Sequence, residues 1–366
     1  MRNIARRVVA GVGLAAWLAA APAGAAQENN WQQEWEKTVA SAEQEGAVTI
    51  YGQSRHPVSA AIQAFEKSYP KIKINFVGGP GSELGSRVMA EKRAGKHLVD
   101  IAVGGSATAV QIYQAAGLLA ALPPSFILPE VRDENAWWGK KHPYSDPETQ
   151  QVFIMQGDAT TRMGAFHTER VKAGEIKSWW DLLDAKWRGK IVMTSPKAVG
   201  NIQSWLFLYV SPELGPKFIT KLVSEAEVTF SSNERQMMDW LATGKYPVHL
   251  LAKPDHVEKA QAQGLPVELL FSEKEAGSIS SGSGHLSVFK DAPHPNAAKV
   301  YINWMLSKRG QLSWQEITSN NSLRIDIPKS MVNQREVPRQ DKQYLVSSQH
   351  QEAMKPLRQL MKELMP

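Results

Sequence analysis

The sequence predicts an α/β fold with mainly parallel sheets, divided into two lobes. The first observation is a repeated order of elements, in which short runs rich in Val and Ile are each followed by a loop and an amphipathic segment. This order is typical of parallel strands joined by right-handed crossovers. The second observation is length, because 366 residues, less a leader of 25, suit two lobes of roughly 150 residues each.

The first 25 residues predict a secretory signal peptide that is not part of the fold. Three arginines lie within the first seven residues, residues 8–21 are apolar, and Ala23-Gly24-Ala25 has the small residues of a cleavage site. A membrane anchor is the alternative, but the apolar run is shorter than the about 20 residues that a spanning helix needs. We therefore expect export to the periplasm, with cleavage after Ala25.

Composition excludes several classes of site. The chain has no cysteine, which rules out disulfides, thiol chemistry, iron–sulfur clusters and cysteine-ligated zinc. The formal net charge of +6 includes three arginines of the leader, and no stretch of Lys and Arg is dense enough to indicate nucleic-acid binding. An exported chain of this kind must be stabilised by large packed cores.

The first half of the chain predicts three strand–loop–helix units. Residues 47–51 form a short buried strand, and apolar residues then recur at helical spacing from Val58 to Tyr69, where Pro70 ends the helix. The further elements are a strand at 72–77, a helix at 83–94, a strand at 99–103 and a helix at 107–116. Residues 123–146, with Pro-Pro and Trp-Trp pairs, predict a long surface excursion.

The alternation resumes after Phe153 and predicts the second lobe and a return segment. Its strands are expected at 189–194, 228–230, 248–251, 267–271 and 285–289, and its helices at 212–224, 233–243, 255–263, 295–307, 309–318 and 353–365. A Ser/Gly tract at 278–284 interrupts the pattern, and the chain contains no internal repeat.

Enzyme motifs are missing. The glycine-rich stretch 78–88 fails the dinucleotide fingerprint, because Leu84 stands where the last glycine of Gly-x-Gly-x-x-Gly must allow close packing of the helix on the sheet. The sequence also lacks a Walker lysine loop, a Gly-x-Ser-x-Gly elbow and a His-Glu-x-x-His pair. We expect no catalysis and no cofactor, with an exported hydrolase as the alternative.

Small polar residues follow several predicted strands, at 52–54, 78–82, 104–106 and 194–195. Ligands of open α/β sheets bind at the carboxyl ends of the strands, where helix N-termini offer free N–H groups. These loops therefore predict a binding cleft, although single loops of this kind are also ordinary turns and caps. For 78–82 we expect an anion grip in which Ser82 caps the helix that starts at Glu83; a cap without a ligand is the alternative.

A set of segments spread over most of the chain carries a family resemblance. They are EGAVTIYG, AFEKSYPKIKINFVGG, RVMAEKRAGKHLVDIAVGG, GLLAAL, SWWDLLDAKWRGKIVM, MDWLATGKYPV, HPNAAKVYINWMLSKRGQ and SLRIDIP. From about Glu45 to Ile327 the chain resembles periplasmic solute-binding proteins of ABC importers with the type II fold, in the branch that contains the ferric-iron-binding transporters.

The resemblance implies two lobes that close on a solute and a membrane permease as partner. It places the crossings between lobes near 164–167 and 278–288, and it makes the Ser/Gly tract hinge or cleft lining, with a plain flexible turn as the alternative. The implied division is residues 1–25 as signal peptide, 26–163 as lobe 1, 164–280 as lobe 2, and 281–366 as the return to lobe 1. A monomer is expected.

The chain departs from the iron-binding pattern of a His, a Glu and a Tyr pair. His56 matches the first position, but the third strand ends in Gly104-Gly105-Ser106 and the strand 248–251 is followed by Ala252-Lys253, so the carboxylate and both tyrosines are missing. We therefore expect no metal site, and a ferric-iron carrier is kept as an alternative.

The predicted ligand is instead a small anionic organic solute that carries a carboxylate, phosphate or phosphonate. Most of the candidate residues offer hydrogen-bond donors, and Arg is suited to a bidentate grip on such groups. The candidate ligand-binding residues are Gln53, Ser54, Arg55, His56, Gly79, Gly81, Ser82, Gly105, Ser106, Arg162, Ser195, Asn233, Lys253, Asp255 and Arg324.

Overall fold

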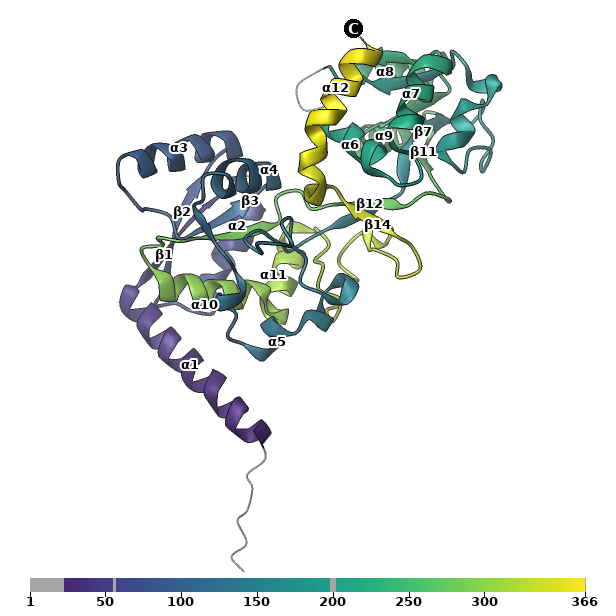
Figure 1. The fold of residues 1–366 in the computed structure, drawn as a ribbon. Helices are drawn as coiled ribbons and strands as arrows, with labels where there is room; N and C mark the ends of the chain where they lie inside the picture. The colour runs from purple at the N-terminus through teal and green to yellow at the C-terminus, as the bar shows by residue number, and fades with distance from the viewer. Residues whose placement is uncertain (1–22, 55–56, 198–201, 366) are drawn as a thin grey trace, which may run out of the picture.

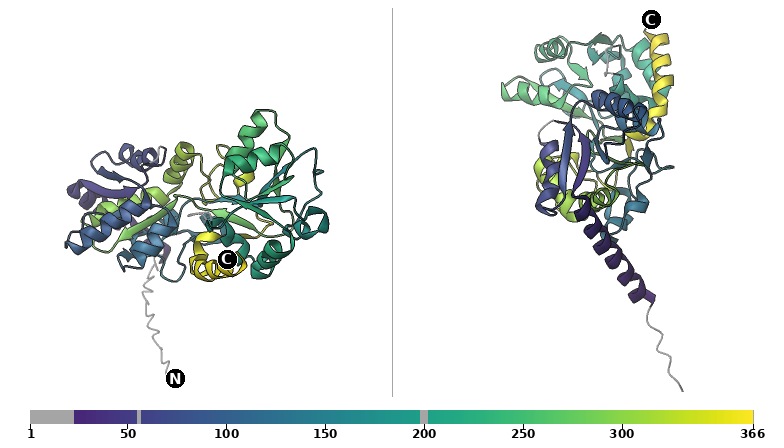
Figure 2. Two further views of the ribbon diagram at one scale, coloured as in Figure 1. Left: turned by 90° about the horizontal axis from the view of Figure 1, so that it is seen from above. Right: turned by 90° about the vertical axis from the view of Figure 1, so that its left-hand side faces the viewer.

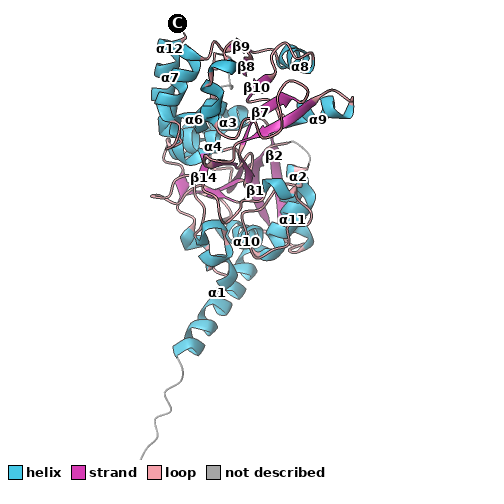
Figure 3. Ribbon diagram, turned by 90° about the vertical axis from the view of Figure 1, so that its right-hand side faces the viewer, coloured by secondary structure: helices cyan, strands magenta, loops and turns pink. Residues whose placement is uncertain are grey.

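The computed structural model describes residues 23–54, 57–197 and 202–365. Residues 1–22 of the predicted signal peptide therefore lie outside the described part. Two lobes are joined by a small sheet, as Figures 1 and 2 show. Helices cover the strands of each lobe (Figure 3).

The sheet of lobe 1 has the strand order β2-β1-β3-β13-β4, and β5 also pairs with β13. Strands β1, β2 and β3 are parallel, as the sequence pattern predicts, whereas β13 runs antiparallel to β3. Because β13 is antiparallel, its first residue lies at the edge where the parallel strands end. The strands are β1 (Ala47–Gly52), β2 (Lys73–Gly78), β3 (Ile101–Gly104), β4 (Leu119–Ala120), β5 (Phe153–Ile154) and β13 (His285–Phe289).

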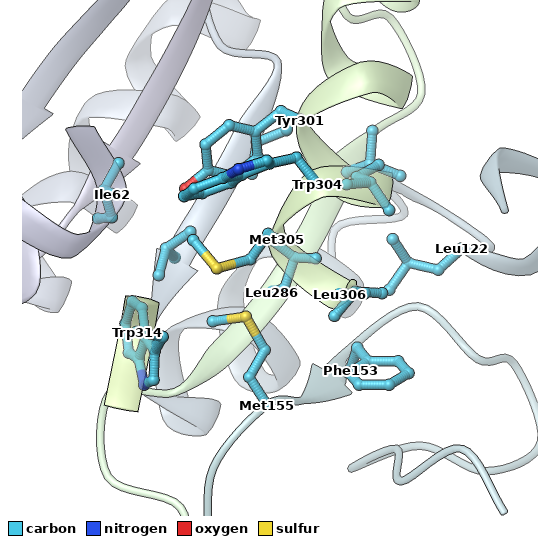
Figure 4. Packing of buried hydrophobic residues seen from close by; sticks show 14 of the residues in the cluster. Ile62, Leu122, Phe153, Met155, Leu286, Tyr301, Trp304, Met305, Leu306 and Trp314 are labelled. Carbon is cyan, nitrogen blue, oxygen red and sulfur yellow. The ribbon is translucent and has the colours of Figure 1, made fainter. Parts of the chain in front are cut away.

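Helices on both sides of this sheet bury a large core. Ile62, Met305, Trp314 and Phe153 are four of its members, labelled in Figure 4, and all four are fully buried. The helical elements are α1 (Ala23–Glu45), α2 (Val58–Gln63), η1 (Ala64–Lys67), α3 (Gly81–Arg93), α4 (Ser106–Thr108), η2 (Ala109–Gln114), α10 (Pro295–Leu306) and α11 (Lys308–Thr318). Glu45, the last residue of α1, accepts hydrogen bonds from the backbone N–H groups of Asn296 and Ala297 and so caps α10.

The sheet of lobe 2 has the order β11-β7-β10-β8-β9. Strands β8, β9 and β10 are parallel, and β7 lies antiparallel between β10 and β11. Trp205 and Phe218 pack on one face and Met238 and Val257 on the other, so the sheet is buried on both sides. The elements are β7 (Arg162–His167), β8 (Ile191–Thr194), β9 (Thr229–Ser231), β10 (Val248–Leu250), β11 (Val267–Phe271), η6 (Trp179–Leu183), η7 (Ala185–Trp187), α6 (Gln203–Val210), α7 (Gly215–Glu225), α8 (Glu234–Ala242) and α9 (Pro254–Ala262).

A three-stranded sheet, which we call the hinge sheet, connects the two lobes in the order β14-β12-β6. Its strands are β6 (Asp158–Thr160), β12 (Gly277–Ser280) and β14 (Tyr344–Val346). The first crossing is β6, which lies before the predicted 164–167, because those residues pair with β10 and β11 inside lobe 2. Strand β12 overlaps the start of the predicted second crossing.

The C-terminal helix α12 (Met354–Leu364) differs from the predicted division, which placed it in lobe 1. It follows η9 (Ser347–Ala353) and packs beside α6 and α7 (Figure 1). Its buried residues Leu357 and Met361 complete the core of lobe 2. The amphipathic pattern predicts the helix correctly, but it cannot tell which of two apolar surfaces covers it.

The predicted surface excursion at 123–146 is also packed more closely than expected. It folds into η3 (Pro123–Ser125), α5 (Pro129–Arg132), η4 (Glu134–Ala136) and η5 (Trp138–Lys140). Trp137 is fully buried, with its ring centroid 4.7 Å from that of Phe153. Later in the chain, a further short helical turn, η8 (Gln334–Glu336), lies next to β6.

Candidate functional site

The lobe 1 half of the candidate site is formed by the loops after β1, β2 and β3. The loops touch, because the N–H group of Gly79 donates to the carbonyl of Gly52 (3.1 Å), and a Cβ atom on Gly78 would lie only 2.8 Å from that of Ser54. Gln53, Gly81 and Gly105 line one cavity of about 20 Å³ together with His285. The structure thus brings predicted residues from three separate loops together.

His285 is the residue of this half that the sequence analysis missed. Its side chain is buried, with Nε2 3.1 Å from the Ser281 hydroxyl and Nδ1 3.2 Å from the Gly104 carbonyl oxygen. Burial lowers the pKa of His285 to about 4, so the ring is neutral near pH 7. The Ser/Gly tract before His285 indicated hinge or cleft lining nearby. The position of His285 itself depends on the antiparallel direction of β13, which brings its first residue to the ligand loops.

The anion grip predicted at 78–82 needs a correction. Helix α3 begins at Gly81, with Pro80 at the cap position and no side-chain cap, so Ser82 does not cap the helix. Its side chain is exposed, and its carbonyl accepts a hydrogen bond from Ser86 (2.9 Å). Pro80 has no N–H group to leave unpaired and is accepted at the start of a helix. The helix therefore begins two residues earlier than predicted, at Gly81 instead of Glu83.

Gly81 packs closely against Thr108 of α4. A Cβ atom at this position would collide with the hydroxyl of Thr108, so another residue here would require that side chain to rotate. The N–H groups of Glu83 and Leu84 both donate to the Pro80 carbonyl. Those of Gly81 and Ser82 make no backbone hydrogen bond within the described residues, and they are the donors this loop offers.

The lobe 2 half is built from the loops after β8, β9 and β10. The N–H group of Ser195 donates to the Ser231 carbonyl (2.9 Å), which joins the first two loops. Asn233 caps α8 by accepting from the N–H group of Gln236 (3.1 Å), so its side-chain oxygen already has a structural role. Lys253 Nζ lies 3.5 Å from Glu234 Oε1, which brings the N-terminal ends of α8 and α9 together.

Arg162 lies at the same edge, where the chain enters lobe 2 through β7. The N–H group of Leu251 donates to the carbonyl of its neighbour Met163 (2.8 Å), so Arg162 stands beside the loop that carries Lys253. Its guanidinium forms no salt bridge or hydrogen bond with any residue that the structure describes. Burial lowers the pKa of Arg162, while the more distant carboxylates of Glu336 and Glu258 act in the opposite direction.

Arg324 is wrongly predicted as a ligand-binding residue. Its side chain is 1% exposed; it bonds Asp326 (2.7 Å) and the Leu306 carbonyl (2.6 Å), and it lies over the Trp137 ring. Nε, Nη1 and Nη2 all donate to acceptors of lobe 1, and the group links Leu306 at the end of α10 to Glu130 and Asp326.

The remaining predicted residues differ in exposure. Gly79, in the loop after β2, and Ser106, the first residue of α4, are half-buried, and Ser54 is exposed. Asp255 is in the first turn of α9, exposed, with its carboxylate 3.7 Å from His256. Arg55 and His56 lie outside the described residues.

Two features are absent from the described residues. These residues contain no group of three or more His, Asp or Glu side chains arranged to hold a metal ion. None of their helices combines the length and the apolar character needed to cross a membrane.

Comparison with known proteins identifies relatives at the level of fold and family. The family described as "Bacterial extracellular solute-binding protein" matches residues 51–312. No curated protein matches the chain in sequence.

Solved structures match over nearly their whole length. Iron-bound HitA from Pseudomonas aeruginosa is 18% identical with a TM-score of 0.57, and Trichodesmium IdiA, in complex with iron and citrate, is 18% identical with a TM-score of 0.63. AfuA from Actinobacillus pleuropneumoniae, with fructose-6-phosphate bound, is 18% identical with a TM-score of 0.53. In each case the match covers 87% of this chain and 99% of the other, which establishes the type II periplasmic binding fold.

Proposed function

Since the chain belongs to the bacterial extracellular solute-binding family, we propose that it captures a small anionic organic solute in the periplasm and delivers it to an ABC permease of the inner membrane. The solute carries a carboxylate, phosphate or phosphonate group. Arg162, Lys253 and the free N–H groups of Gly81 and Ser82 are the donors that would meet it.

Arg162 is the observation that carries this proposal. A partly buried guanidinium without a salt-bridge partner among the described residues has fewer water contacts than an exposed one and gains no close opposite charge in return. An oxyanion of the solute would supply that charge through two parallel hydrogen bonds. Lys253 is a weaker candidate for the main contact, since Glu234 already faces it at 3.5 Å.

The two alternatives make different demands. A ferric-iron carrier needs hard anionic ligands, whereas the described loop residues are mainly donors and Arg162 would repel the cation. A hydrolase needs a nucleophile and base in the site. Among the described residues, the Asp–His pair with the shortest distance is Asp100 and His294 (2.9 Å). It lies at the end of β3 opposite the ligand loops, and Asp100 also accepts a hydrogen bond from the N–H group of Thr49.

The experiment is a thermal-shift screen over organic acids, phosphate esters, phosphonates, sugars, amines and Fe(III)-citrate, followed by titration calorimetry. We expect the largest shift from an anion, and a Kd raised about 10- to 100-fold in Arg162→Gln but less in Arg162→Lys. Arg188→Gln removes the same charge from an exposed position outside the site and serves as the control.

Three outcomes overturn parts of the proposal. An anion that binds Arg162→Gln as tightly as the wild type removes the role of Arg162. A shift confined to Fe(III)-citrate, with colour from charge transfer, favours the iron carrier. Chemical turnover of the bound compound, followed by NMR, favours the hydrolase.

A further inference from the structure

We propose that His285 is a positioning residue that couples the hinge to the lobe 1 ligand loops, through the turn of residues 281–284. The turn begins directly after hinge strand β12 and ends where β13 enters the lobe 1 sheet. The coupling rests on the family's solute-binding role but not on the charge of the solute.

The turn is held by the other lobe-to-lobe connection as well. The N–H group of Met155, which directly follows β5, donates to the carbonyl of Gly284 (2.8 Å). A Cβ atom on Gly284 would collide with the side chain of Gln156, and Gln156 Oε1 accepts a hydrogen bond from Trp314 (2.7 Å). Both connections therefore meet at this turn and are fixed to the buried core of lobe 1.

The imidazole of His285 extends this contact to the ligand loops. Nδ1 lies beside the Gly104 carbonyl and Nε2 beside the Ser281 hydroxyl, and the Gly282 backbone also bonds to the ring. Gly104 ends β3, and Gly105 is the cap residue of α4. The ring thus bridges the first residue after the hinge strand and the last residue of a ligand strand.

The same ring also faces the cavity shared by Gln53, Gly81 and Gly105. A shift of Ser281 during hinge rotation must therefore either carry the ring with it or break the bond. In the first case the cavity changes shape as the lobes move, and a group of the solute in the cavity favours one hinge position. Differential contact with two states is what a ligand needs in order to shift their populations.

The test measures the hinge directly in the solute-free full chain. Because the sequence has no cysteine, spin labels on Ser86→Cys in α3 and Lys259→Cys in α9, both exposed, report the distance between lobes by pulsed electron spin resonance. Ser281→Ala removes one bond of the bridge, and His285→Gln keeps a donor for Gly104. Ser287→Ala is the matched control, since its hydroxyl is buried in β13 without a partner among the described residues.

We expect Ser281→Ala to broaden the distance distribution and to change the ratio of hinge states about fivefold, the effect of one ordinary hydrogen bond. His285→Gln should give an intermediate change and Ser287→Ala none. A distribution in Ser281→Ala that matches the wild type, in a protein of unchanged thermal stability, overturns the proposal. If Ser281→Ala does not fold, an unchanged distribution in folded His285→Gln does the same. Neither result depends on which solute binds.

Discussion

Replacement of His249 by leucine should stabilise the protein and weaken its sensitivity to acid. His249 is in the middle of β10, fully buried, and neither ring nitrogen has a hydrogen-bond partner in the described structure. It lies on the face of the sheet covered by Met238, Leu241 and Val257, since its strand neighbours point to the other core. Burial lowers the pKa of His249 to about 4, and His256 adds to the effect.

The sign follows from proton linkage. The unfolded chain binds a proton at a pKa of about 6.5 and the folded protein only at about 4, so the unfolded state holds more protons between these values. The contribution of His249 is therefore fully present above pH 6.5 and is lost as the pH falls toward 4. The loss is about 2 kcal/mol at pH 5 and about 3 kcal/mol at pH 4.

Leucine removes both the proton site and the two unpaired nitrogens. We expect His249→Leu to raise the free energy of unfolding by about 1 to 2 kcal/mol at pH 7.5 and by about 3 to 4 kcal/mol at pH 5. The assay is urea unfolding at a series of pH values. Only the difference from wild type is used, because burial raises the pKa of Asp158 to about 6 and makes an opposite contribution over the same window.

Met238→Leu, which lies on the same face of the sheet and removes no titratable group, is the control and should leave the pH dependence unchanged. Our reasoning is refuted if His249→Leu and wild type lose stability in parallel between pH 7.5 and pH 5. A loss of stability at pH 7.5 would show instead that the ring makes packing contacts that leucine cannot replace.

Two further predictions follow from the corrected residues. Arg324→Met should lower the free energy of unfolding by about 3 kcal/mol in urea, because it leaves the Leu306 carbonyl without its charged donor, and it should leave the solute Kd unchanged in calorimetry. Gly81→Ala should lower the melting temperature through its collision with Thr108, whereas Ser82→Ala, one residue away, should change stability by less than about 0.5 kcal/mol because no cap is lost; equal effects of the two would contradict the structure of this loop.

Much of the fold was predictable because strand and helix periods are local properties of the sequence. The parallel order of β1, β2 and β3, with a polar loop after each strand, follows from the alternation of apolar runs and amphipathic segments. This order also placed Gln53, Gly81 and Gly105 at one edge of the sheet, and all three line the same cavity. Parallel strands end at the same edge, so their loops can be predicted to meet without any knowledge of side chains.

The errors concern contacts between residues far apart in the sequence. Arg324 has the charge of a ligand-binding residue, and only the fold shows that Glu130 and Leu306 already use its donors. The prediction that Ser82 caps α3 is wrong for a local reason, because Pro80 also suits the start of a helix and takes the cap position. His285 was missed because a strand that returns from another lobe can run in either direction.

The choice between an anionic and a cationic solute depends on which charges at the site are already neutralised. Lys253 faces Glu234, and this pair adds little net charge to the lobe 2 edge. Arg162 has no such partner, and its two influencing carboxylates, on Glu258 and Glu336, lie beyond salt-bridge distance. A cation at this edge would be repelled by the Arg162 guanidinium, and repulsion in a partly buried setting is stronger than in water. An anion would be attracted instead, which supports the proposed carboxylate, phosphate or phosphonate.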